Sequence, residues 1–390
     1  MSRPPDSILF MRRSELSSEI DAIQMASQNH VPLKIGNHYV PQLYLKQWAV
    51  DKTILTYRLL VSHERVPMWT RKPLSGIAYH LHLYTYVGAE GATDEFEQWL
   101  EREFETPAAS PIQKAINRQQ MSTGDWTALI RFAAAQDVRT PARLIDFLRR
   151  QGEGMQELMD RTVAESVAKL ERGEVTLQST QAHSALSSSQ GPFKVVTTPR
   201  ENGTGQLEVR TVVGRRLWLS LFPHILTKTI APLLKHQWTI LRAPDGITWP
   251  TSDNPVVRLN YYKDGTYDLK GGWGVEGGEI FMPLNSQYLL YTKIGEKRAH
   301  PRNTRLDRNT ALLLRRMIVQ NAHRYVFDGT ESDVAQIRPR IVNEEEFKTE
   351  EATWERWNTE QSDAEIELEE FGRRSTRSQP PSPGGNSGHP

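Results

Sequence analysis

The chain has 390 residues, of which 38% are hydrophobic, and its net charge is +1, with 48 lysine and arginine residues against 47 aspartate and glutamate residues. It contains no cysteine, which excludes a thiol nucleophile, a cysteine-ligated zinc site and any disulfide framework. This length allows two domains or one large α+β domain, and the hydrophobic fraction is sufficient for a sizeable core.

The sequence predicts a soluble, cytoplasmic protein without membrane contact. Residues 1–5 do not begin the charged and apolar pattern of a secretory signal. No apolar run approaches the roughly 20 residues of a membrane span. The absence of cysteine agrees with an intracellular setting.

The charge is distributed unevenly along the chain. Residues 344–370 contain twelve acidic residues, and residues 344–390 together carry a charge of −7. The rest of the chain is therefore at 1 − (−7) = +8. Two interpretations stay open: an acidic tail that contacts and masks a basic groove for an anionic partner, or a solvated tail that aids solubility.

The first half of the chain is predicted to be largely helical. After a mobile arm at residues 1–30, Pro41 starts a short helix that carries Tyr44 and Trp48 on one apolar face. Strands are expected at residues 54–57 and 77–86. A helix follows from Asp94, another runs from Ser122 to a break at residues 140–141, and residues 142–172 continue as an amphipathic helix.

The second half is predicted to be rich in strands. A linker or insertion is expected near residues 174–208, and residues 212–236 form a helix with a break at Pro223. Strands are expected at residues 237–242, 247–252, 256–262, 279–282 and 288–293, before a helix at 303–323 and a strand at 325–327. The fold class is therefore α+β over residues 31–340, with a largely helical N-terminal half, an antiparallel or mixed β-rich C-terminal half and a closing helix.

The tail at residues 341–390 is first acidic and then rich in proline, serine and glycine, which predicts disorder. Trp354 and Trp357 are unusual in such a tail. They would allow an acidic helix to be anchored on the body of the protein or on a partner.

Four segments of the chain resemble a known family. They read HYVPQ from His38, FAAAQDVRTP from Phe132, TSDNPV from Thr251 and NAHRYVF from Asn321. In this order they are similar to the domain of unknown function 4238 (DUF4238) family, over roughly residues 38–328. The resemblance implies a fold and a prior for the site but no reaction, and the chain departs from the family between residues 150 and 210 and in the acidic tail.

His38 and Asp253 are candidate catalytic residues. His38 precedes a helix start, where an imidazole can act as a general base or bind a divalent metal, although a lone histidine is more often structural. Asp253 lies in a turn between two strands, where it would orient His38 or bind the metal together with Asn254, unless both residues only stabilise the turn.

Arg139 is the third candidate catalytic residue, as a clamp for an anionic group. Arg139 and Gln136 lie at helical offsets that return to the apolar face, so both need buried partners. These are either each other and the backbone carbonyls freed by Pro141 or, for Arg139, an anionic group of a substrate. Gln42, Asn254, Asn321 and Arg324 complete the candidate substrate-binding set with Gln136. For the residues around Asn321 the alternative is a role in ending the last helix.

Two further charged patterns have a functional and a structural interpretation. Glu97, Glu101 and Glu105 form one row of like charges, which either salt bridges or a metal must offset. His80 and His82 would lie on one side of a strand, as a metal-chelating pair or as surface residues. No phosphate-binding glycine loop is present, which disfavours nucleotide-cofactor chemistry.

The leading hypothesis is a hydrolase-like enzyme acting on a phosphate-bearing substrate or nucleic acid, with His38 as base or ligand, Asp253 as orienter and Arg139 as anion clamp. The alternative is a non-catalytic interaction module whose basic body is masked by its acidic C-terminal tail. The enzyme hypothesis requires these three residues to line one cavity.

Overall fold

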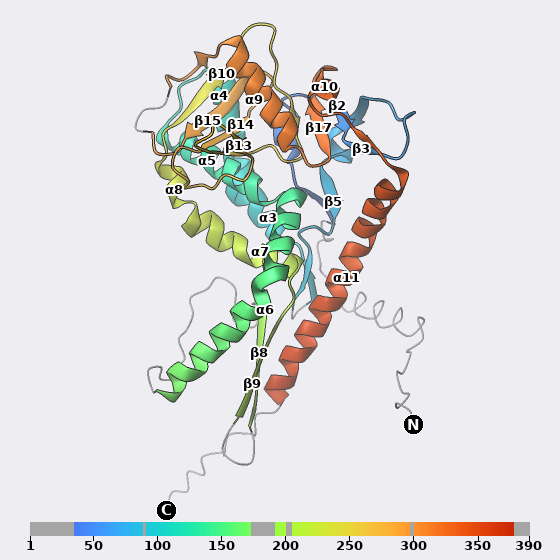
Figure 1. Cartoon of the computed structure of the whole chain (residues 1–390), viewed down its shortest axis with the longest axis vertical. Coiled ribbons are helices and arrows are strands. Elements are labelled where there is room, and N and C mark those ends of the chain that lie inside the picture. The colour runs from blue at the N-terminus through green and yellow to red at the C-terminus, as the bar shows by residue number, and fades with distance from the viewer. Residues whose placement is uncertain (1–34, 89–90, 173–191, 200–204, 297–299, 378–390) are drawn as a thin grey trace, which may run out of the picture. The chain divides into compact units, whose positions relative to one another are not determined.

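The computed structural model describes residues 35–88, 91–172, 192–199, 205–296 and 300–377, which belong to one unit that begins at Ile35 (Figure 1). The predicted arm at residues 1–30, the serine-rich part of the predicted linker and the last part of the tail, residues 378–390, lie outside these described residues.

A six-stranded sheet organises the second half of the chain. All neighbouring strands are antiparallel except β10 and β16, which are parallel. In spatial order the strands are β13 (Tyr267–Asp268), β12 (Val257–Tyr261), β14 (Glu279–Pro283), β15 (Tyr288–Lys293), β10 (Trp238–Arg242) and β16 (Thr304–Arg305).

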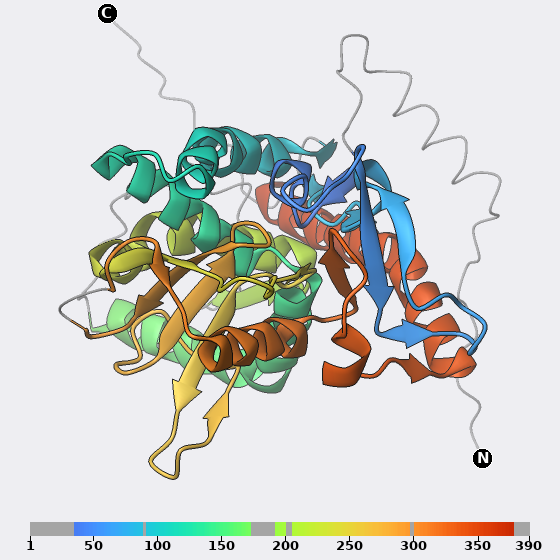
Figure 2. The same cartoon turned by 90° about the horizontal axis from the view of Figure 1, so that it is seen from above.

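Both faces of this sheet are buried. Successive side chains of a strand point to opposite sides, and they belong to two different core clusters. Phe281 packs with Leu314 of α9 (Arg308–Asn321), whereas its neighbour Met282 belongs to the larger core cluster with the other helices. Figure 2 shows the strands between the orange α9 and the teal helices α4 (Thr106–Ile116) and α5 (Thr123–Val138). The sheet is thus the middle layer of an α+β arrangement.

The helical layer follows local signals in the sequence. Ser122 and Asp125 form a reciprocal capping box at the start of α5, as the sequence predicts. The helix ends at Val138 with Arg139 as its C-cap, and Pro141 begins α6 (Pro141–Glu171). The remaining helices of the layer are α3 (Glu95–Leu100), a π-helical turn (Glu101–Glu105), α7 (Arg215–His224), a second π-helical turn (Ile225–Thr229) and α8 (Ala231–Lys235).

A four-stranded sheet joins the two ends of the domain, so strands are not confined to the C-terminal half. Its order is β11 (Thr251–Ser252), β17 (Tyr325–Asp328), β2 (Thr53–Arg58) and β4 (Thr70–Pro73), and all pairs are antiparallel. The smaller elements are β1 (Gly36–His38) paired with β5 (Tyr79–Leu81), β3 (Leu60–Val61) with β18 (Ile341–Val342), β6 (Tyr86–Gly88) with β7 (Gly91–Thr93), α2 (Gln42–Leu45), η1 (Leu74–Gly76) and α10 (Val334–Ile337).

Part of the predicted linker near residues 174–208 is regular structure. The strands β8 (Phe193–Pro199) and β9 (Gly205–Thr211) form an antiparallel hairpin. The turn-forming residues between them suggested a linker, but the flanking sequences KVVTT and QLEVRT are rich in β-branched residues, which favour strands.

The prediction of a disordered tail from residue 341 is wrong for most of its acidic part. A long helix, α11 (Glu344–Arg377), packs on the hairpin strand β8 and on β6. Glu365 and Glu369 are buried on it and pair with Arg215 and Arg216 of α7. Because the partner cations come from the body of the protein, the charge of the tail alone could not predict this helix.

One described helical segment, residues 215–235, is long and apolar enough to cross a membrane by length and composition, contrary to our expectation from the sequence. In this fold the N-terminal part of the segment lies in the hydrophobic core. Trp218, Phe222 and Leu226 are buried, and the guanidinium of Arg215 contacts Glu365 at 2.7 Å.

Candidate functional site

Asp253 connects two of the four segments that resemble a known family, the one that begins at Thr251 and the one that begins at Asn321. Its carboxylate accepts hydrogen bonds from the backbone N–H groups of His323 (2.7 Å), Arg324 (2.6 Å) and Tyr325 (3.0 Å). Strand β11 lies beside β17 immediately next to this contact. The side chain of Asp253 therefore fixes the turn that follows α9, and it lies at the wall of a cavity.

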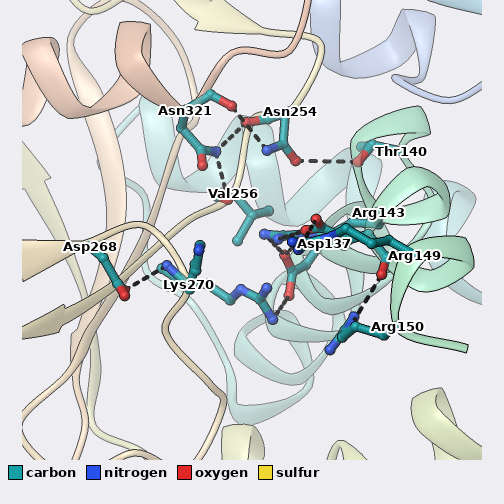
Figure 3. A network of polar contacts seen from close by, with 12 residues as sticks. Asp137, Thr140, Arg143, Arg149, Arg150, Asn254, Val256, Asp268, Lys270 and Asn321 are labelled. Atoms are coloured by element: carbon teal, nitrogen blue, oxygen red, sulfur yellow. Dashed lines mark hydrogen bonds and ion pairs between the residues drawn. The ribbon is translucent and has the colours of Figure 1, made fainter. Parts of the chain in front are cut away.

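Asn254 and Asn321 form a reciprocal buried pair, shown in Figure 3. The Asn254 side-chain N–H₂ donates to the backbone oxygen of Asn321 at 3.0 Å, and the Asn321 side-chain N–H₂ donates to the backbone oxygens of Asn254 and Val256. Thr140 donates its hydroxyl hydrogen to Asn254 Oδ1 at 3.2 Å. These two predicted substrate-binding residues thus use their amide donors within the protein.

Arg139 is buried among internal partners. Its Nη1 lies 2.5 Å from Glu105 Oε1, its Nη2 donates to the backbone oxygen of His38 at 2.5 Å, and Glu97 lies at 4.0 Å. Its Nε–H donates to the hydroxyl of Tyr84 at 3.2 Å. Two glutamates of the row, Glu97 and Glu105, are therefore offset by Arg139, and this geometry favours a structural role over an anion clamp.

The side chain of His38 lies outside the set of described residues that line the cavity. Its Nε2 is 3.2 Å from Gln42 Nε2, and its ring lies against Tyr79 with centroids 5.6 Å apart. Gln136 is buried and donates its side-chain N–H to the backbone oxygen of Tyr39 at 2.7 Å. The structure thus joins Arg139 to the backbone of His38 but does not bring His38, Arg139 and Asp253 around one cavity.

The cavity has a volume of about 890 Å³ and lies between the four-stranded sheet, the β5 segment, the turn after α9 and helix α11. Of the predicted site residues, Asp253 and Arg324 line it. The other polar groups that matter for its chemistry are Arg58, Lys72, His80 and His323.

Two of the three histidines that line the cavity, His80 and His323, are uncharged near neutral pH. Burial lowers the pKa of His80 to about 4, with the neighbouring His323 as a second cause. Burial also lowers the pKa of His323 to about 4, with Arg324 and Arg338 as further causes. Burial raises the pKa of Asp253 to about 6, against the effect of its three N–H donors, so this carboxylate is ionised at pH 7.

No pattern in the sequence pairs His80 with His323. His80 and His82 were predicted to lie on one side of a strand, but the strand ends at Leu81 and His82 has a φ of 55°, which breaks the alternation. Among the described residues, no group of three or more histidine, aspartate or glutamate side chains is placed to hold a metal ion. The signal for His323 was its position inside the NAHRYVF segment.

Helix α11 contributes negative charge to this basic cavity. Glu350 Oε2 lies 2.5 Å from Arg324 Nε, Glu346 lies 3.8 Å from Arg324, and Glu351 lies 3.8 Å from Arg58. The acidic part of the tail is therefore in contact with the basic body, as one of the two sequence interpretations has it.

These features define an α+β protein in which sequence-distant polar segments form one wall of a cavity and an acidic helix forms another. The model of the family described as "Protein of unknown function (DUF4238)" matches residues 37–332, which is more than half of the chain. The chain belongs to this family, and α11 lies beyond the matched region. No curated protein and no solved structure matches the chain.

Proposed function

We propose that the cavity is the active site of a hydrolase-like enzyme that acts on a phosphate-bearing substrate, with His323 as the general base. The observation that carries this proposal is the position of His323 in the same cavity as Arg58, Lys72 and Arg324, where burial lowers the pKa of its imidazole to about 4. Guanidinium and ammonium groups bind phosphate oxygens, and a neutral imidazole can accept a proton from an attacking water. The absence of cysteine supports a cytoplasmic setting.

In this proposal each group has a separate role. His323 accepts the proton of a water molecule as its oxygen attacks phosphorus, and the P–O bond to the leaving group breaks. The negative charge of the bound phosphate raises the pKa of the imidazole, so proton transfer becomes more favourable than in the empty cavity. Asp253 is a positioning residue, because it acts on His323 through the backbone N–H.

The test compares His323→Gln with His38→Ala in a phosphoester hydrolysis screen, run with and without a divalent cation. We expect His323→Gln to lose most of the turnover with an almost unchanged melting temperature. His38→Ala is the matched control, because it removes an imidazole outside the cavity lining, and it should retain activity. Full activity of His323→Gln would remove His323 from the reaction, and loss of activity in His38→Ala alone would return the assignment to His38.

The second candidate function is a non-catalytic module that binds an anionic partner. It is favoured by one specific observation: Glu350 and Glu351 of α11 lie against Arg324 and Arg58 in the cavity. The combined variant Glu350→Gln and Glu351→Gln should then bind a polyanion such as heparin more tightly, with a steep salt dependence and no turnover. Deletion of the tail is a poor test, because it would also remove the buried partners of two arginines.

A further inference from the structure

One turn of α11 presents an aromatic ring and two carboxylates to the cavity. The indole of Trp354 stacks on the imidazole of His80, with ring centroids 4.0 Å apart and planes inclined by 19°. His80 also stacks on Tyr39 at 5.4 Å. Glu350 and Glu351 lie four and three residues before Trp354, so charge and ring are roughly 5–6 Å apart along the helix axis.

The carboxylates of this turn contact cations that suit phosphate. Glu350 contacts Arg324, and Glu351 contacts Arg58. A carboxylate and a phosphate both offer acceptor oxygens with negative charge to a guanidinium fork. The turn therefore places the indole of Trp354 on the imidazole of His80 and its two carboxylates on Arg58 and Arg324.

The ion pairs of α11 at the cavity are more open to solvent than those near its C-terminal end. The side chains of Arg324 and Glu350 are 24% and 19% exposed, and Glu351 is 51% exposed. By contrast, Arg215 and Glu365 are 1% and 0% exposed. The exposed pair of Arg58 and Glu351, at 3.8 Å, contributes little to stability, so an anionic ligand can replace this carboxylate at small cost.

We propose that this turn occupies the position of a nucleotide unit, with Trp354 in place of the base on His80 and the two glutamates in place of phosphate on Arg58 and Arg324. The substrate class of the cavity is thus a base joined through a sugar to a phosphate. This proposal rests on the proposed function, in which the cavity takes a phosphate-bearing substrate. A phosphate without a ring would leave the stacking surface of His80 without use, whereas every nucleobase has a face that stacks.

The same chemistry has two sources, a free nucleotide or a single-stranded nucleic acid. The free-nucleotide arm compares the binding of adenosine 5′-monophosphate with that of ribose 5-phosphate. The strand arm compares a short 5′-phosphorylated single-stranded oligonucleotide with its abasic analogue. In each pair the two probes share the phosphate and the sugar and differ only in the base.

The variant is Trp354→Ala, and Ile366→Ala is its matched control, because Ile366 is an exposed apolar residue on the same helix. Trp354→Ala removes the competitor of the base. We expect it to tighten binding of the base-containing probe by about 5- to 100-fold in one arm, with little change for the base-free probe, as measured by titration calorimetry. Ile366→Ala should bind like the unmodified protein.

A second substitution, Trp354→Leu, keeps an apolar side chain at this position and decides the question if Trp354→Ala does not fold. Base-dependent tightening in either arm supports the proposal and identifies the source. Equal binding of the paired probes in both arms, unchanged by either Trp354 variant, overturns it while the proposed function stands. Failure of every phosphate probe to bind, in every variant, overturns the proposed function itself.

Discussion

Replacement of Asp253 by alanine tests whether this residue acts through structure or through chemistry. The substitution leaves three N–H groups, those of residues 323–325, without their carboxylate acceptor. Each buried donor without a partner costs about 1–3 kcal/mol. Because these donors lie beside a cavity that water can enter, we take the lower part of that range and expect the free energy of unfolding to fall by about 3–5 kcal/mol.

The measurement is equilibrium unfolding in urea at pH 7, compared with Asp245→Ala. Asp245 is 76% exposed and contacts Arg305 at 2.6 Å, so its loss should cost less than about 1 kcal/mol. If Asp253→Ala unfolds at the same urea concentration as Asp245→Ala, the carboxylate of Asp253 does not stabilise the turn after α9. If it then also lacks phosphoesterase activity, Asp253 takes part in the chemistry directly.

The pH dependence of this cost gives a second check with a definite sign. The pKa of Asp253 is raised from 3.8 to about 6 in the folded protein, so the folded state holds the proton more tightly than the unfolded state between these values. The contribution of Asp253 to stability is therefore complete below about pH 4 and falls as the pH rises through 6. The stability difference between the unmodified protein and Asp253→Ala should be larger at pH 4 than at pH 7, by up to roughly 3 kcal/mol.

Three further predictions follow from the buried groups. Arg139→Met leaves two carboxylates without their buried cation and should lower the free energy of unfolding by about 3–5 kcal/mol, measured by chemical denaturation; an unchanged midpoint would contradict the buried pairing. Because the folded-state pKa values of His80 and His323 are lowered from 6.5 to about 4, the protein should lose stability as the pH falls from 6.5 to 4, and His323→Gln should show a shallower loss in the same titration. Leu314→Ala opens a cavity between α9 and the six-stranded sheet and should cost about 2–5 kcal/mol in the same assay, whereas a loss below 1 kcal/mol would mean that this interface is loosely packed.

The sequence predicted those elements whose signals are local. The start of α5 is a capping box within four residues, and its end precedes a proline that restricts its neighbour. The strands at residues 53–58, 238–242 and 288–293 were also expected within a few residues, because their apolar and β-branched runs are bounded by turns. In each case the deciding atoms lie close together along the chain.

The sequence could not predict pairings between distant segments. Strand β2 pairs with β17, which lies about 270 residues later, and no local pattern encodes that choice. Buried partners were expected for Arg139 from its helical position, and the structure supplies Glu105 and the backbone oxygen of His38. Trp354 and Trp357 indicated that an acidic helix could be anchored on the body, but the partners of α11 could not be predicted, since Glu365 is buried only because Arg215 meets it.

The segments that resemble the family contain polar residues that build the cavity wall, and most of the side chains first proposed for the site are used inside the protein. Asp253, Asn254 and Asn321 form internal hydrogen bonds that allow two distant segments to meet. A polar residue that satisfies backbone groups leaves fewer donors or acceptors for a substrate, whereas the side chain held beside it at the cavity remains available for chemistry. By this argument His323, whose backbone is fixed by Asp253, is a better candidate for the reaction than the residues that fix it.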